Sequence, residues 1–358
     1  MKNLLIYCVI AIAMLSLTNC RKSPGNKGGA TADVYVAGYE VNTAGKVIAK
    51  YWKNGVAVNL SDGTNDTYGN AIVVNGGDVY VVGYETTAPG GMVTVAKYWK
   101  NGVAVNLTDG TTWAFPLAIA VNGGDVYVAG YEFNPAGGVP NFVAKYWKNG
   151  VAVNLTDGTN DARANAIVVN GSDVYLAGYE TNAAGKVIAK YWKNGVAVNL
   201  TDGTNDADAN AMVVNGSDVY VAGYEFNPAG VIRSNVAKYW KNGVAVNLID
   251  GTNSAQANAI VVNGGDVYVA GNVSHAVLNN NNYTATYWKN GVAVKLTDGT
   301  FDARASAMVV NGSDVYVAGD ETNAANELVS IAKYWKNGVA VTLTDGTYVA
   351  GATSIFIK

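Results

Sequence analysis

Charged residues, cysteine and histidine are scarce in this chain of 358 residues. Only 14% of the residues are charged, with 24 Lys and Arg against 27 Asp and Glu, whereas 49% are hydrophobic. A disordered chain has the opposite balance, and a nucleic-acid binder needs a basic stripe, so both classes are excluded. Two cysteines exclude a disulfide scaffold, and one histidine, His275, excludes a histidine-based metal site or triad. No phosphate-binding loop or metal-ligand cluster is present, and the sequence predicts no metal and no cofactor.

The first twenty residues have the pattern of a secretory signal. Lys2 is followed by an uncharged apolar run from Leu4 to Leu17, which is shorter than the roughly 20 residues of a membrane span. The ending Leu17-Thr-Asn-Cys20 resembles the lipobox of bacterial lipoproteins, in which the cysteine is lipidated and becomes the mature N-terminus. This resemblance implies a signal at residues 1–19 and a lipid on Cys20. An ordinary cleaved signal or an uncleaved anchor is the alternative.

Residues 20–32 carry Gly, Pro and charge without apolar periodicity, and they are predicted to be a flexible tether. Arg21 follows the cysteine where an inner-membrane lipoprotein would have aspartate, so the resemblance favours the outer membrane of a Gram-negative bacterium. We therefore expect an extracytoplasmic, lipid-anchored monomer that touches the membrane only through its lipid.

Two short motifs recur every 45 to 48 residues through the rest of the chain. Asp-Val-Tyr begins at Asp33, Asp78, Asp125, Asp173, Asp218, Asp266 and Asp314, and Tyr-Trp begins at Tyr51, Tyr98, Tyr146, Tyr191, Tyr239, Tyr287 and Tyr334. This period is typical of propeller blades and too long for one rung of a solenoid.

Each repeat divides into four expected strands. In the second repeat these are the apolar run 71–74, the segments 78–85 and 95–100, and residues 103–107 after the hairpin signal Asn101-Gly102. The first repeat lacks its innermost strand, and Ser354–Ile357 at the other end of the chain aligns with that strand. The sequence thus predicts an all-β, seven-bladed propeller over 33–358, closed by a C-terminal strand that completes the N-terminal blade.

The repeats resemble kelch-like propellers over residues 33–358. Segment 161–178, Asp-Ala-Arg-Ala-Asn-Ala-Ile-Val-Val-Asn-Gly-Ser-Asp-Val-Tyr-Leu-Ala-Gly, carries the likeness. Two features depart from that family. The paired glycine that the family has after the second strand is Gly-Tyr here, as in Gly83-Tyr84, and the family's tryptophan follows the third-strand turn, whereas the tryptophan of this chain precedes it. The resemblance therefore implies the fold and no partner.

Differences between repeats are concentrated on one predicted face. Loop length varies only between the second and third strands, where twelve residues separate Gly38 from Tyr51 and fifteen separate Gly130 from Tyr146. One side chain, expected in the connection just before the innermost strand, also changes: Tyr68, Phe115, Arg163, Asp208, Gln256, Arg304 and Gly351. Dissimilar side chains around a channel mouth suit a binding surface on a rigid scaffold, whereas free drift of exposed loops is the alternative.

The second full repeat differs most, because Trp113, Phe115 and Pro116 replace Asp66, Tyr68 and Gly69. We expect its aromatic side chains to be exposed and able to stack on a sugar or grip a protein. The candidate ligand-binding residues are Tyr68, Trp113, Phe115, Arg163, Asp208, Gln256 and Arg304.

Other repeated residues are expected to be structural. The seven Trp of the Tyr-Trp motifs should pack between blades, and the Glu and Lys of neighbouring strands, which are lost together at Val273 and Thr286, should form ion pairs. The Asp-Gly-Thr-Asn-Asp loops have too few ligands for a typical calcium site. His275, in a long loop, has no acid or nucleophile beside it.

The sequence favours a binding or scaffold propeller that recognises a protein or glycan on its variable face. A glycan-acting hydrolase or lyase is the second hypothesis, although Asp208 is the only acid at the variable position. A structural repeat protein without a specific ligand is the third.

Overall fold

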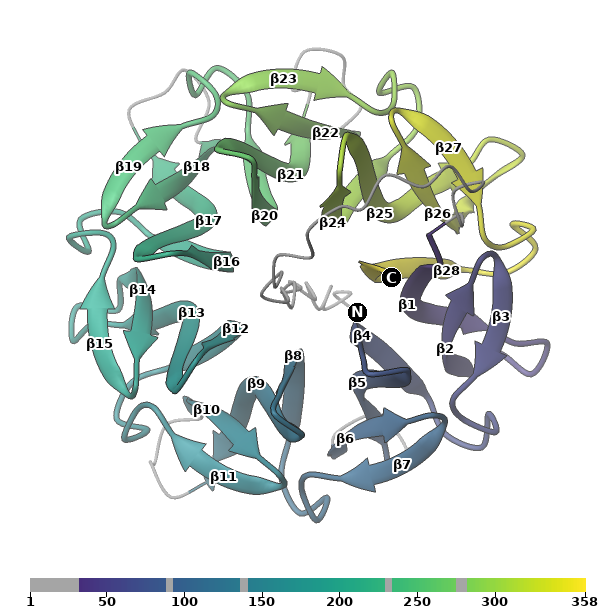
Figure 1. Cartoon of the computed structure of the whole chain (residues 1–358), viewed down its shortest axis with the longest axis horizontal. Coiled ribbons are helices and arrows are strands. Elements are labelled where there is room, and N and C mark those ends of the chain that lie inside the picture. Colours follow the sequence, from purple (N-terminus) through teal and green to yellow (C-terminus); the bar gives the residue numbers. More distant parts are fainter. Residues whose placement is uncertain (1–31, 88–92, 136–140, 229–233, 275–281) are drawn as a thin grey trace, which may run out of the picture.

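The computed structural model describes residues 32–87, 93–135, 141–228, 234–274 and 282–358. Seven four-stranded antiparallel sheets form a ring, with the innermost strand of each sheet toward the common axis (Figure 1). The fold class predicted from the sequence is therefore confirmed. Within the described ranges, no helix has the length and apolar character to cross a membrane.

The blades are numbered from the N-terminus, and each is given from its innermost strand outward. Blade 1 consists of β28 (Ala350–Ile357), β1 (Val34–Val41), β2 (Val47–Lys53) and β3 (Val56–Asn59). Blade 2 consists of β4 (Thr67–Asn75), β5 (Asp78–Thr86), β6 (Thr94–Lys100) and β7 (Val103–Asn106). Blade 3 consists of β8 (Ala114–Asn122), β9 (Asp125–Asn134), β10 (Asn141–Lys148) and β11 (Val151–Asn154).

The other blades repeat this order. Blade 4 consists of β12 (Ala162–Asn170), β13 (Asp173–Thr181), β14 (Val187–Lys193) and β15 (Val196–Asn199). Blade 5 consists of β16 (Ala207–Asn215), β17 (Asp218–Asn227), β18 (Ser234–Lys241) and β19 (Val244–Asn247). Blade 6 consists of β20 (Ala255–Asn263), β21 (Asp266–Ser274), β22 (Tyr283–Lys289) and β23 (Val292–Lys295). Blade 7 consists of β24 (Ala303–Asn311), β25 (Asp314–Asn323), β26 (Asn326–Lys336) and β27 (Val339–Thr342).

The ring is closed by β28, which pairs antiparallel with β1. Ser354 lies opposite Ala37 and Ile357 opposite Val34, and backbone hydrogen bonds of 2.9 and 3.0 Å join Asp33 and Lys358 at the end of the pair. The closing strand starts at Ala350, four residues earlier than its apolar run indicated. A β-bulge accounts for the difference, because the register shifts after Ala37 and pairing then resumes.

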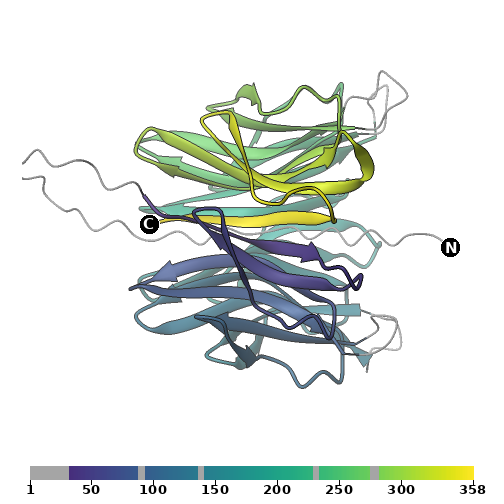
Figure 2. The ribbon, with the colours of Figure 1, turned by 90° about the vertical axis from the view of Figure 1, so that its right-hand side faces the viewer.

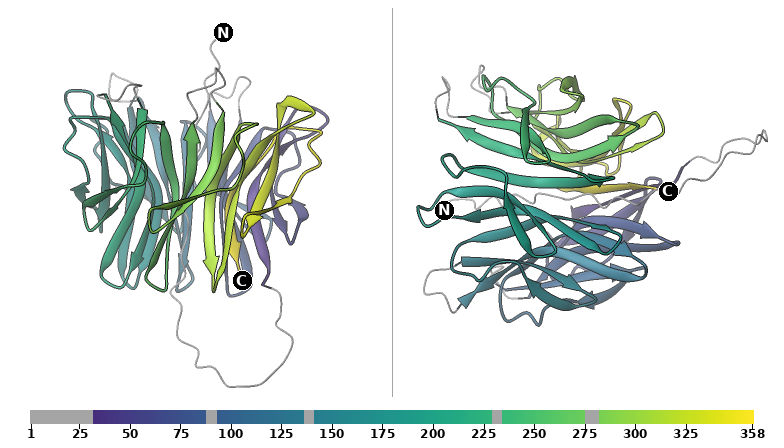
Figure 3. Two further views of the ribbon diagram at one scale, coloured as in Figure 1. Left: turned by 90° about the horizontal axis from the view of Figure 1, so that it is seen from above. Right: turned by 60° about the vertical axis from the view of Figure 1, so that its left-hand side comes forward.

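The two faces of the ring are built differently. Strands run between the faces in the side views (Figures 2 and 3). One face, which we call the turn face, carries seven Asn-Gly turns, in which every Asn has a φ of 50–51° as a type I′ turn requires. Asn54 shows why Asn is used, since its Oδ1 accepts a hydrogen bond from Val34 N and its Nδ2 donates one to Asp33. The opposite face, the variable face, carries the connections between second and third strands.

The core lies between neighbouring blades. One cluster joins Ala118 of blade 3, Ile167 and Trp192 of blade 4, and Met212 of blade 5. All seven Tyr-Trp tryptophans are at most 2% exposed, which confirms that they are packing residues. The inner strands carry fully buried alanines such as Ala164, whose small side chains let seven blades converge on one axis.

Ring closure yields a stability prediction. Ile355 of β28 is 2% exposed, so Ile355→Ala should lower the free energy of unfolding by about 2–5 kcal/mol in chemical denaturation. Val103→Ala is the matched control, because Val103 is 69% exposed on an outermost strand and should change stability by less than about 0.5 kcal/mol. Equal effects of the two changes would contradict the closing role of β28.

Candidate functional site

The variable side chains predicted from the repeats sit at one level of the ring. Each is the second residue of its innermost strand, and none lies in the preceding connection where the sequence analysis expected it. A bulge explains the error, because in every blade the register shifts one residue after this position and the strand extends beyond the apolar run. The residues are Tyr68, Phe115, Arg163, Asp208, Gln256, Arg304 and Gly351.

A glycine on the second strand makes room for each bulge. A Cβ on Gly178 would lie 1.9 Å from the carbonyl oxygen of Arg163, and one on Gly83 would lie 1.8 Å from that of Tyr68. Because the contact is made by backbone, the variable side chain can change without disturbing it. The bulge thus requires glycine at this place, three residues after the Tyr of each Asp-Val-Tyr motif, because any side chain there would collide with the carbonyl of the variable residue.

A second variable position faces the first. The residues opposite are Tyr39, Tyr84, Tyr131, Tyr179, Tyr224, Asn272 and Asp320. We call these two sets together the axial ring. Comparison of the repeats could have found the second set, since Gly-Tyr becomes Gly-Asn and Gly-Asp in the last two copies. At Gly351 no side chain is present, and a Cβ there would lie 3.0 Å from the ring of Tyr39.

Aromatic side chains fill the axial ring from blade 1 to blade 3. Ring centroids are 5.3 Å apart for Tyr39 and Tyr68, 5.0 Å for Tyr68 and Tyr84, 5.1 Å for Tyr84 and Phe115, and 5.1 Å for Phe115 and Tyr131. The stacked and edge-on geometries are those that aromatic pairs prefer. Five rings from three blades therefore form one continuous arc.

Blade 3 adds three further aromatic side chains to this arc. Phe142 lies 5.0 Å from Tyr131, and Trp113 lies 5.4 Å from Phe133. Trp113 and Phe115 were predicted from the sequence to be exposed, but both are half-buried because these rings pack on them. Phe133 and Phe142 were not predicted from the sequence, although each replaces a Val at the matching position of blade 1, Val41 and Val47.

Arg163 follows the aromatic arc in blade 4. Its Cζ lies 4.6 Å from the ring centroid of Tyr131 and 5.6 Å from those of Phe142 and Tyr179. Tyr179 donates a 3.0 Å hydrogen bond to Asp161, whose other oxygen accepts one from Phe142 N. The Asp161 carboxylate is therefore used in positioning the rings around the guanidinium.

Asp208 occupies the variable position of blade 5. Its Oδ1 accepts a 2.9 Å hydrogen bond from Asn165 Nδ2, and the same amide also donates to Ala209 O. Burial raises the pKa of Asp208 to about 7, although the charge of Arg163 acts in the opposite direction. This carboxyl group is thus partly protonated at neutral pH.

Polar side chains complete the axial ring in blades 6 and 7. Asn272 is buried and accepts a hydrogen bond from Ala305 N of the next blade. Arg304 lies 3.8 Å from Asp302, and burial raises the pKa of Asp320 to about 6. Gln256 is half-buried beside them. The axial ring is therefore aromatic on one side and rich in planar polar groups on the other.

Asparagines below the axial ring join neighbouring blades; Asn70 and Asn210 are buried and Asn258 is half-buried. Asn70 donates to Pro116 O at 2.7 Å, Asn210 to Ala257 O at 2.9 Å, and Asn258 to Ala305 O at 2.9 Å. Thr353 does the same from blade 1 to Gly69 O. These bonds hold the innermost strands at fixed spacing and make the axial ring a rigid frame.

The repeated acids away from the axial ring are engaged in structure. Six Glu–Lys ion pairs join second and third strands in every blade except blade 6, as the sequence predicted. In the Asp-Gly-Thr-Asn-Asp loop, Asp62 accepts from Thr64 N and Asp66 from Val47 N. Among the residues that the structure describes, no group of three or more His, Cys, Asp or Glu is placed to hold a metal ion.

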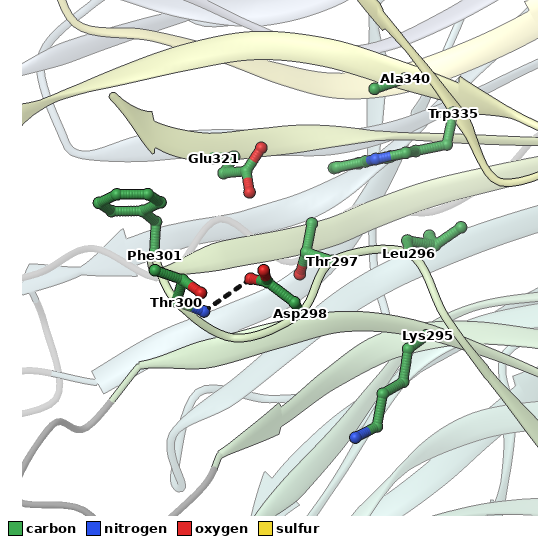
Figure 4. Close-up of a pocket in the computed structure, with 9 residues that line it drawn as sticks. All are labelled: Lys295, Leu296, Thr297, Asp298, Thr300, Phe301, Glu321, Trp335 and Ala340. Atoms are coloured by element: carbon green, nitrogen blue, oxygen red, sulfur yellow. Dashed lines mark hydrogen bonds between the residues drawn. The ribbon is translucent and has the colours of Figure 1, made fainter. Parts of the chain in front are cut away.

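Hollows between blades are poorer candidates than the axial ring. One of about 570 Å³ lies between blades 6 and 7, with Leu296, Phe301 and Trp335 in its lining (Figure 4). Its acids are occupied, since Asp298 accepts from Thr300 N and Glu321 pairs with Lys333. A hollow of about 580 Å³ repeats the arrangement between blades 2 and 3. Cys20 and His275 lie outside the described residues.

Comparisons with known proteins support the propeller fold alone. No protein-family model and no curated protein matches the sequence. The chain is similar in structure to a puromycin-hydrolyzing peptidase of Mycobacterium tuberculosis, with 11% identity and a TM-score of 0.59 over 88% of this chain and 52% of the other. It thus spans about half of that peptidase. The kelch-like resemblance finds no support beyond the shared architecture.

A second structure of similar fold is a propeller by itself. The β-propeller domain of the Trilobed protease from Pyrococcus furiosus is 9% identical, with a TM-score of 0.53 over 91% of this chain and 95% of that domain. An acylaminoacyl peptidase gives a TM-score of 0.52 at 10% identity, over 87% of this chain and 50% of its own. At these identities the likeness concerns architecture only.

The raised pKa of Asp208 predicts a pH dependence of stability. Folded Asp208 keeps its proton up to about pH 7, whereas an unfolded Asp loses it near pH 4. Between these values the folded state binds more protons, so the free energy of unfolding should fall as pH rises. Denaturant titrations from pH 4.5 to 8 should show a smaller fall in Asp208→Asn than in wild type. If the curves of stability against pH run parallel in wild type and Asp208→Asn, the raised pKa of Asp208 is contradicted. Asp320→Asn is the control, because the pKa of Asp320 is raised only to about 6 and its contribution to the fall should end near that pH.

Proposed function

We propose that the protein is a binding module that captures its ligand with the axial ring on the variable face. The observation that carries the proposal is the contrast between a repeated frame and its variable side chains: the innermost position holds six residue types in seven blades, and the position opposite changes from Tyr to Asn and Asp in blades 6 and 7. A protein or a glycan would fit such a surface. Rigid frames that present diversified side chains are typical of recognition sites.

A glycan is the better match of the two. Sugars combine a C–H face, which stacks on aromatic rings, with hydroxyl groups that pair with planar polar side chains. The axial ring offers both, with the aromatic arc in blades 1–3 and Asp208, Gln256, Asn272, Arg304 and Asp320 in blades 5–7. A protein ligand would favour a larger apolar centre than this half-polar ring provides.

A lipid anchor on Cys20 would leave the variable face free. Asp33, where the propeller begins, lies beside Lys358 at the turn-face end of β1. A flexible tether of residues 20–32 has a typical span of roughly 20 Å, which would hold the turn face near the membrane. We propose a monomer anchored in this way, outside the cytoplasm and on the outer membrane.

Glycan hydrolysis or cleavage by a lyase is the second candidate function. It is favoured by the two half-buried carboxyl groups of the axial ring, Asp208 and Asp320, whose pKa values are raised to about 7 and about 6. A general acid needs a pKa near the working pH. Release of new reducing ends from a bound glycan, lost in Asp208→Asn, would favour this function over simple binding.

The proposed lipid anchor is tested by measuring whether the protein incorporates a labelled fatty acid. Cells that express the full chain should incorporate labelled palmitate into the protein, and Cys20→Ala should lose the label and release the protein from the membrane fraction. Cys8→Ala is the matched control and should keep the label, because Cys8 lies within the proposed signal. Label retained in Cys20→Ala would refute the anchor.

The binding site is tested on arrays of glycans and surface proteins. Tyr68→Leu with Phe115→Leu removes two stacking faces while keeping apolar volume, and we expect glycan capture to fall by about tenfold or more. Trp113, Phe115, Arg163 and Arg304 are also half-buried, so changing all four together to Ala would lower stability as well as capture.

The control for this experiment lies on the turn face. Val56→Ala with Val103→Ala removes two side chains that are both 69% exposed there, and it should leave capture unchanged. Capture of proteins but of no glycan would move the ligand class to proteins. Absence of any ligand would favour a purely structural repeat protein.

A further inference from the structure

We propose that Arg163 is the subsite for a carboxylate group, and that the ligand of the axial ring is therefore a glycan containing an acidic sugar. This inference rests on the proposed function, because it assigns the chemistry of one position in the same ring. It specifies that the ligand is negatively charged and that Arg163 binds the charged group.

The surroundings of Arg163 leave its hydrogen-bonding capacity unused. Its Nε is buried and has no hydrogen-bond partner. Among the described residues, no Asp or Glu oxygen comes within 4.0 Å of its guanidinium, unlike Arg304, which lies 3.8 Å from Asp302. The neighbours of Arg163 are the rings of Tyr131, Phe142 and Tyr179. The guanidinium therefore packs on aromatic rings without an anionic acceptor in direct contact, although Asp161 and Asp208 are near enough to act on its charge.

The shape of the guanidinium specifies the missing partner. Its N–H groups lie in one plane and match the two oxygens of a carboxylate in a bidentate pair. Contact with the three rings restricts the side chain, so little conformational freedom remains to be lost on binding. A ligand carboxylate that approaches along the axis of the ring would thus accept hydrogen bonds from the preorganised guanidinium of Arg163.

The other charged and titratable groups near Arg163 decide when the subsite is open. Asp161 is engaged by Tyr179 OH and Phe142 N, and burial raises the pKa of the Tyr179 phenol, which is neutral at physiological pH. Asp208 is held by Asn165 and faces Arg163 and Tyr179 of blade 4 and Tyr224 of its own blade. When ionised, Asp208 would compete with a carboxylate ligand for the field of Arg163; when protonated, it would not.

The neighbours of the subsite favour an acidic sugar over a peptide C-terminus. Phe115 and Phe142 provide ring faces on the blade 3 side, their centroids 6.3 Å apart. Asp208 and Gln256 provide planar polar groups on the blade 5 and 6 side. A carboxylate on a sugar ring would place hydroxyl groups beside these polar side chains and C–H groups over the aromatic ones.

The experiment compares acidic glycans with their own carboxyl-reduced forms. The purified protein is applied to an array that carries uronate- and sialate-bearing oligosaccharides, each printed beside the product in which CO₂H is reduced to CH₂OH. C-terminal peptides and their amides are printed as well. We expect binding to at least one acidic glycan to exceed that to its reduced form by about ten- to a hundredfold, the usual effect of a charge-assisted pair.

Three variants assign the preference to Arg163. Arg163→Met keeps an unbranched side chain among the rings and should abolish the preference, while Arg163→Lys should keep part of it. Lys186→Gln removes a positive charge from an exposed side chain of the variable face and should leave the preference intact. Thermal melting of each variant verifies that it is folded.

The pH dependence gives an independent readout. The preference for the acidic form should grow as pH falls from 8 to 6 in wild type and stay nearly constant in Asp208→Asn. Equal binding of acidic and reduced glycans would overturn the inference and leave the proposed function standing. A preference unchanged in Arg163→Met, or capture of peptide carboxylates alone, would also overturn it. Failure of every glycan would instead refute the proposed function.

Discussion

The structure depends on the pairing of β28 with β1. A propeller blade buries its faces only when a neighbour stands on each side, so an open ring would expose two apolar sheets. Residues more than 300 positions apart, such as Val34 and Ile357, must therefore meet before blades 1 and 7 have a complete core. Closure also fixes the distance of every innermost strand from the axis, and with it the size of the axial ring.

The bulge at each innermost strand separates the frame from its side chains. The carbonyl of the variable residue packs on glycine, and the side-chain amides of Asn70, Asn210 and Asn258 donate to carbonyls of the next blade. All of these contacts involve backbone atoms of the variable strand. Side chains as different as Tyr68, Arg163 and Asp208 can consequently occupy the same place without a change of fold. The turn face, by contrast, uses side chains of Asp and Asn in its turns and has no such freedom.

The axial ring is asymmetric although its frame is repeated. Aromatic contacts run without interruption from Tyr39 to Tyr131, and cation–π contacts extend them to Arg163 and Tyr179. Beyond this point the side chains are polar, and burial raises the pKa of Asp208 to about 7 and that of Asp320 to about 6. Such a division gives a ligand one orientation on a frame that would otherwise offer seven equivalent ones.

Period, strand pattern and turn chemistry were enough to determine the fold from the sequence. Asn-Gly pairs demand type I′ turns, buried tryptophans recur at one place, and Ser354–Ile357 supplies the strand that the first repeat lacks. The turn and the buried tryptophan are determined by residues close together in the sequence, and the same pattern occurs seven times in one chain. The first half of the axial ring was also visible as a position that varies among constant neighbours.

The tertiary structure alone decided which side chains meet. Tyr131 and Phe142 of blade 3 and Tyr179 of blade 4 surround Arg163, and no spacing in the sequence encodes a contact across blades. The burial of Trp113 and Phe115, the bond from Asn165 to Asp208 and the resulting pKa likewise depend on neighbours that come from other repeats. Sequence therefore fixed each blade, whereas the packing of blades around one axis created the environment of the site.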